Sequence, residues 1–137
     1  MDKKEELLTE ILKRVQRNYV HMVEIERLTK ELGDAFSRND RETVGLVMKM
    51  RQDEMDRVSE AKEEIQLLEE SADEETGNRI ASWLKGEDKY SADSFEAKKI
   101  LELSEQFHQV LNRTITIDKT INLKLAGKDS YYQNTAV

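Results

Sequence analysis

The sequence predicts an all-α protein, an elongated antiparallel helical bundle or coiled-coil hairpin of three long helices with a short connector helix. Three observations support this fold class. Apolar residues recur at steps of three and four over long stretches, the chain of 137 residues has no proline and only five glycines, and 37% of its residues are charged. One helical domain is expected over residues 1–127, followed by a flexible C-terminal tail over residues 128–137.

The first helix is expected over residues 3–36. Its apolar positions keep a helical spacing almost without interruption: Leu8, Ile11, Val15, Tyr19, Met22, Ile25, Leu28, Leu32 and Phe36. The following segment "SRND" predicts a turn and a new helix cap. Asn39, with Glu42 three residues later, fits a capping box, and Asp40 is a close competitor.

The second helix is expected over residues 40–71. Arg51 and Lys62 interrupt its apolar stripe at positions where a long aliphatic stem can lie along the seam. The stripe itself consists of Val44, Met48, Met55, Val58, Ile65 and Leu68. Residues 72–92 hold two glycines and several capping residues, which predicts a connector with a short helix around Ile80, Trp83 and Leu84.

The third long helix is expected over residues 93–126. Asp93 with Glu96 fits a second capping box, and Gly127 suits the position just beyond a helix end. Within it, "NRTITIDKTINLKLAG" (residues 112–127) also alternates like a strand, but no other segment offers a pairing partner. The helix is therefore favoured, although β-branched residues are poor helix formers and this end must depend on packing for its order.

Two residues of this third helix, Ile115 and Leu123, lie off the seam that Ile117 and Ile121 define. They widen the apolar face beyond what one helix contact must cover. Either this wide face touches a second partner, or the two residues pack under the connector that contains Trp83.

Several functional classes are excluded by residue content. The chain has no cysteine, no glycine-rich loop and no nucleophile elbow, which argues against thiolate sites and nucleophilic catalysis. Glu105 and His108 lie one turn apart, as in di-iron carboxylate bundles, but no second Glu-x-x-His pair accompanies them, and His21 is the only other histidine. We expect no enzyme activity, no metal and no cofactor.

Charge and hydropathy narrow the choice of partners. The net charge is -7, acidic residues dominate between positions 52 and 96, and no basic face is evident, which argues against a nucleic-acid partner. No apolar run approaches the length of a membrane span, and the N-terminus lacks the apolar core of a signal peptide. These features predict a cytoplasmic protein without membrane insertion.

The segment "LTKELGDAFSRNDRETVGLVMKMRQDEMDRVSEAKEEIQLLEE" resembles the FlgN family of flagellar export chaperones, and more loosely the related FliT-type chaperones. The resemblance covers residues 19–70 by pattern. It covers the rest of the chain by the order of its elements, a hairpin, an acidic connector, a third helix and a short aromatic tail.

This resemblance implies a cytoplasmic, non-enzymatic chaperone of type III flagellar export, which binds hook-filament junction proteins and delivers them to the export gate. In the tail, Tyr131 or Tyr132 would dock at the gate. The alternative, from the residues themselves, is that the two tyrosines fold back to cover a helix end. Client binding would fall on the third helix, at Leu103, Phe107, Val110, Leu111, Ile115, Ile117, Ile121 and Leu125.

Two alternatives stay open at this point. One is a structural or regulatory coiled-coil protein, a homodimer that self-associates through its third helix. The other is a FliT-type chaperone of the filament cap, which would share nearly every predicted feature and differ in its client.

Overall fold

The computed structural model describes residues 2–135, with side chains described for residues 2–125. Its elements are α1 (Lys3–Ser37), α2 (Arg41–Glu70), α3 (Glu74–Leu84), a 3-10 turn η1 (Lys89–Ser91) and α4 (Phe95–Thr135). Over the described residues the chain is helical with no strand, which confirms the predicted fold class.

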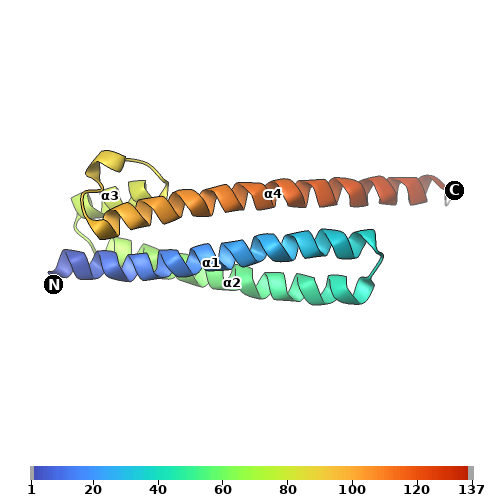
Figure 1. Ribbon diagram of the computed structural model, residues 1–137, viewed down its shortest axis with the longest axis horizontal. Helices are drawn as coiled ribbons and strands as arrows, with labels where there is room; N and C mark the ends of the chain where they lie inside the picture. Colours follow the sequence, from blue (N-terminus) through green and yellow to red (C-terminus); the bar gives the residue numbers. More distant parts are fainter. Residues whose placement is uncertain (1, 136–137) are drawn as a thin grey trace.

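The three long helices lie side by side (Figure 1). Helices α1 and α2 form an antiparallel hairpin, and α4 lies along α1 and runs parallel to it. The short elements α3 and η1 cover the end of the bundle that holds the N-terminus. They turn the chain back, so that α4 begins beside the start of α1.

The helix starts depend on short polar caps. The Asp40 carboxylate accepts a hydrogen bond from the backbone N–H of Thr43 at 3.1 Å, whereas Asn39 adopts a left-handed φ of 56°. Asn39 is therefore not the cap, and the competitor Asp40 takes that role. Likewise Ser94, and not Asp93, caps α4, because its hydroxyl accepts from the N–H three residues later at 3.1 Å.

The largest group of buried side chains lies at the connector end of the bundle. All four helices contribute to it, and α3 covers the end of the three-helix bundle there. Trp83 is 1% exposed, and its indole N–H donates to the Ser91 hydroxyl at 2.9 Å. The cluster contains Leu8, Ile11, Leu12, Val15, Ile65, Ile80, Trp83, Ala92, Ala97, Ile100 and Leu101.

The core becomes thinner toward the α1–α2 turn. A middle cluster still joins α1, α2 and α4, around Met22, Ile25 and Val110. The cluster nearest the turn consists of α1 and α2 residues only: Leu28, Leu32, Phe36, Val44 and Val47. In this part of the bundle α4 is packed much less deeply than at its start.

The apolar stripe of α2 differs from the predicted one near the turn. Val47 is buried at 3% exposure, whereas Met48, predicted in the stripe, is 50% exposed. The stripe steps from Val44 to Val47 and then to Arg51, which turns toward α4 and bonds to Asp118. Arg51 therefore keeps its predicted place in the seam, and the difference is confined to the residue between Val44 and Arg51, which is Val47 and not Met48.

The far end of α4 also differs from the expectation. The helix continues through Gly127 to Thr135, where the sequence predicts a helix end at 126 and a separate tail from 128. A glycine in a helix costs about 1 kcal/mol relative to alanine, but unlike proline it keeps the backbone hydrogen bonds. The side chains of Tyr131 and Tyr132 lie outside the described residues.

Candidate partner-binding groove

A groove of about 620 Å³ lies between the end of α1 and the second half of α4. It occurs where the core is thinnest, beyond the last cluster that includes α4 residues. The apolar side chains of its lining are buried or half-buried and form the floor, and the polar ones are exposed and form the rim. The lining residues are Lys30, Gly33, Asp34, Phe36 and Ser37 from α1, and Thr116, Ile117, Thr120, Ile121, Lys124 and Leu125 from α4.

Gly33 sets the distance between the two walls. A Cβ atom at this position would lie 3.2 Å from the Cδ1 atom of Ile121, which is closer than ordinary van der Waals contact. Glycine therefore lets α4 approach α1 closely, and Ile121 is 8% exposed as a result. Gly33 lies one turn before the end of α1 at Ser37, and its lack of a side chain serves the packing of α4.

The segment that could be read as a strand, residues 112–127, is helical throughout. Its threonines bond back to the carbonyl four residues earlier, with distances of 2.8 Å for Thr114, 3.1 Å for Thr116 and 3.1 Å for Thr120. These bonds satisfy the hydroxyls within the helix, which is how threonine is accommodated in helical segments. Thr114 is buried, and its hydroxyl is satisfied by its bond to the Val110 carbonyl.

An ion pair joins α2 to α4 next to the groove. The Arg51 guanidinium donates to the Asp118 carboxylate at 2.7 Å and to the Thr29 hydroxyl at 3.3 Å. Thr29 is fully buried and donates in turn to the Ile25 carbonyl at 2.7 Å. One arginine thus contacts all three long helices and fixes the position of α4 where apolar contacts are few.

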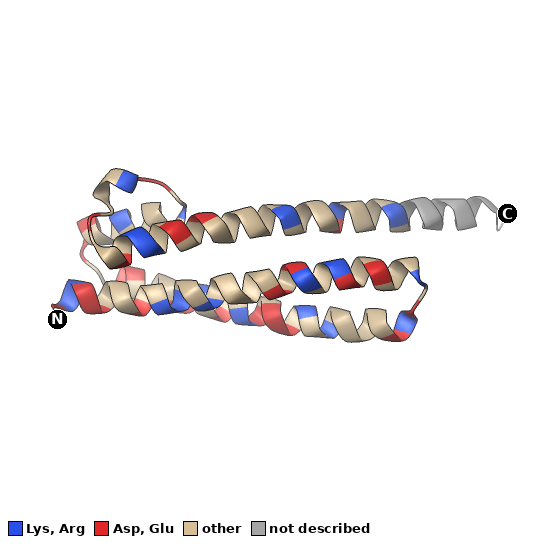
Figure 2. Cartoon of the chain, in the orientation of Figure 1, with Lys and Arg blue, Asp and Glu red and all other residues tan. Residues whose placement is uncertain are grey.

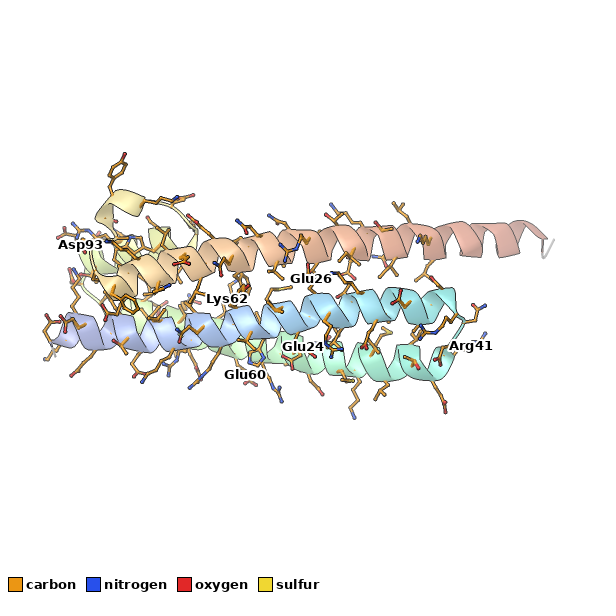
Figure 3. The ribbon with its side chains drawn as sticks, viewed as in Figure 1. Glu24, Glu26, Arg41, Glu60, Lys62 and Asp93 are labelled. Carbon is orange, nitrogen blue, oxygen red and sulfur yellow. The ribbon has the colours of Figure 1, made fainter. Side chains whose placement is uncertain are left out.

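A second ion pair holds α4 to α1. The Arg113 guanidinium donates to both carboxylate oxygens of Glu26, at 2.9 and 3.3 Å, and Glu26 lies on the α4 side of α1 (Figure 3). These hydrogen bonds lower the pKa of Glu26 below its ordinary value of 4.5, although partial burial opposes the shift.

The pH dependence of stability should report this ion pair. A carboxylate with a lowered folded pKa stabilises the protein above pH 4.5, and this contribution is lost as the pH falls through the folded pKa. We expect Glu26→Gln to be less stable than wild type at pH 7 and equally stable in acid, as measured by urea unfolding across pH. Glu60→Gln, an exposed change on α2 outside the described ion pairs (Figure 3), is the control and should run parallel to wild type. A constant gap between Glu26→Gln and wild type at every pH would contradict this assignment.

The predicted client-binding residues fall into three groups. Ile117, Ile121 and Leu125 line the groove. Val110 is part of the middle core cluster with Phe107 and Leu111 packed against it, and Leu103 packs against the connector-end cluster. Ile115 lies outside the groove lining and is 41% exposed.

Leu123 is also outside the groove lining and is 74% exposed. Neither Leu123 nor Ile115 packs under the connector, because α3 lies at the opposite end of the bundle (Figure 1). Sequence reasoning did not identify the α1 wall of the groove. The one available signal was Gly33, a small residue inside an otherwise regular helix.

Each of the two histidines lies within hydrogen-bonding distance of one oxygen atom. His108 lies 3.1 Å from the Leu84 carbonyl, and His21 lies 2.6 Å from the Glu54 carboxylate. Glu105 points toward Lys89, at 3.9 Å. Within the described part of the chain, no three candidate ligand side chains are grouped in a way that would hold a metal ion.

Charges are distributed unevenly over the fold (Figure 2). Along the α1–α2 hairpin several arginines are paired: Arg14 with Glu10 and Glu64, Arg27 with Glu24 and Glu31, and Arg57 with Glu54. Between Leu111 and Leu125, α4 carries three basic residues, Arg113, Lys119 and Lys124, and one acidic residue, Asp118. Lys30 and Lys124, on the two walls of the groove, take part in none of the ion pairs found among the described residues.

The fold and the groove define an elongated helical bundle with an open site at one end. Comparison with protein-family models, with curated proteins and with solved structures found no match. None of the described helices combines the length and apolar character needed to cross a membrane.

Proposed function

We propose that the protein is a cytoplasmic, non-enzymatic chaperone that binds a helical segment of its client in the groove between α1 and α4. The observation that carries this proposal is the groove itself, which exposes apolar side chains of α4 beside a core cluster that contains no α4 residue. Such a site suits an amphipathic helix, whose apolar side would otherwise be exposed.

The spacing of the groove residues favours a helical occupant. Ile117, Ile121 and Leu125 repeat every four residues on one face of α4, and they extend over about 12 Å at 1.5 Å per residue. A partner helix of about three turns would cover this length and could present residues at i, i+4 and i+7. Phe36 supports the same surface from α1.

The resemblance to FlgN-type chaperones supports a specific client class. By that resemblance the clients are hook-filament junction proteins, and the complex is delivered to the type III flagellar export gate. Docking at the gate through Tyr131 or Tyr132 rests on the resemblance alone. A FliT-type chaperone with filament-cap clients would use the same groove with another peptide.

One observation favours a second candidate function, a structural coiled-coil protein that forms a homodimer. Ile115 and Leu123 expose apolar side chains on α4 outside the groove. Exposed apolar residues on a long helix are a common basis for self-association. In that case light scattering would show a dimer that persists on dilution.

The deciding experiment is calorimetric titration of the full chain with C-terminal peptides from hook-filament junction proteins and from filament-cap proteins. We expect one peptide class to bind with micromolar or tighter affinity. A chain ending at Leu111 keeps every residue of the largest core cluster but lacks the α4 wall, so binding should be lost. Circular dichroism would verify that its helices remain.

Two results would contradict the proposal. Undiminished binding by the chain ending at Leu111 would place the client elsewhere. Failure of every flagellar peptide, together with a stable dimer in the same sample, would instead support the structural coiled-coil protein.

A further inference from the structure

The rim of the groove carries two lysines on opposite walls. Lys30 belongs to α1 and Lys124 to α4, and both are exposed. Neither belongs to an ion pair found among the described residues. The acidic residue of the lining is Asp34, so the groove has more basic than acidic side chains in a protein of net charge -7.

The positions of the two lysines along the groove follow from one contact. Gly33 meets Ile121, and α1 and α4 run parallel (Figure 1). Lys30 precedes Gly33 by three residues, and Lys124 follows Ile121 by three residues. At 1.5 Å per residue, the two cations are therefore offset by about 9 Å along the helix axes.

From this geometry we propose that the groove selects an amphipathic helix whose apolar stripe is flanked by acidic residues, one on each edge and about six positions apart. This inference rests on the proposed function and names the chemistry of its partner. The apolar stripe covers the Ile117, Ile121 and Leu125 face, while the two carboxylates reach Lys30 and Lys124. Asp34, between the lysines, disfavours further acidic residues in the middle of the α1 edge.

Electrostatic pairs of this kind contribute to selection more than to total affinity. Each exposed pair adds a small gain, and a basic residue at the same place adds repulsion instead. The charge preference should therefore be clear between peptides that share one apolar stripe. It should decline with salt, because the screening length falls from about 10 Å at 0.1 M to about 3 Å at 1 M.

The test uses the full chain and three synthetic helical peptides with one identical leucine stripe. The first carries glutamates at the two edge positions, and the second carries lysines there. The third has the composition of the first, with its glutamates moved to the face opposite the leucines. At low salt we expect the first to bind about fivefold more tightly than the third and at least about tenfold more tightly than the second.

Charge reversal in the protein provides the matched comparison. The double variant Lys30→Glu/Lys124→Glu should bind the lysine-edged peptide more tightly than the glutamate-edged one. Lys49→Glu/Lys62→Glu changes two exposed lysines of α2 by the same net charge and should keep the wild-type order. All four substituted positions are exposed, and circular dichroism would verify the fold.

The outcomes separate this inference from the proposed function. Equal binding of the three peptides, or an order that the Lys30/Lys124 reversal leaves unchanged, overturns the inference while the groove remains a peptide site. Binding of no peptide to the wild-type chain contradicts the groove as a site and the inference with it.

Discussion

Replacing Trp83 with alanine is expected to lower the free energy of unfolding by about 3–5 kcal/mol, the range typical of large buried aromatic residues. Trp83 is 1% exposed and stands in the cluster that joins all four helices. Its removal leaves a cavity against Ile80 and Ile100 and takes away the hydrogen bond to Ser91. Urea unfolding followed by circular dichroism measures the change.

Tyr90 provides the control for this prediction. It belongs to the same connector but is fully exposed, so Tyr90→Ala should change the unfolding free energy by no more than about 0.5 kcal/mol. Equal destabilisation by Trp83→Ala and Tyr90→Ala would show that the connector does not close the core as described.

The largest expected effect on binding comes from Ile117→Asp combined with Ile121→Asp. Both side chains line the groove, and two carboxylates there would remove apolar contact area and bring unpaired charge into the interface. We expect the affinity for the client peptide to fall at least about 100-fold, which corresponds to the loss of central interface residues. Calorimetric titration with the peptide that binds wild type measures it.

Two further variants make this result interpretable. Ile115→Asp combined with Leu123→Asp introduces the same charges into the same part of α4, but at exposed positions outside the groove, and should leave binding almost unchanged. Ile121 also packs against Gly33, so Ile117→Asp alone separates loss of binding from loosening of α4. If both double variants weakened binding equally, the client would not be confined to the groove.

The helical content of this chain could be predicted from periodicity, because long helices with a regular apolar stripe leave a strong signal. The detailed contacts between the helices could not be predicted in this way. Met48 and Val47 are both apolar, and either keeps a helical spacing between Val44 and Arg51, so periodicity alone does not show that Val47 is the buried one. The sequence offers Asn39 and Asp40 as competitors for the cap of α2, and its capping-box pattern indicates Asp93 where Ser94 caps α4, since neighbouring polar residues compete for the same role.

The groove was predictable on one wall only. Ile117, Ile121 and Leu125 follow from the spacing within α4. Lys30 and Gly33 belong to α1, more than eighty positions earlier in the chain, and periodicity within one helix does not reveal which residues of another lie opposite. That pairing depends on the path of the connector, which sets the register of α4 against α1. The periodicity of the sequence does not predict this register.

The placement of α3 and α4 beside the start of α1 has a consequence for synthesis. Leu8 and Ile11 leave the ribosome well before much of their core, including Trp83, Ile100 and Leu101, is translated. The hairpin of α1 and α2 can pair earlier, but the nascent chain keeps the apolar start of α1 incompletely covered until α4 begins to emerge. The acidic residues between positions 52 and 96, translated during this interval, keep the growing chain charged while its main core is still open.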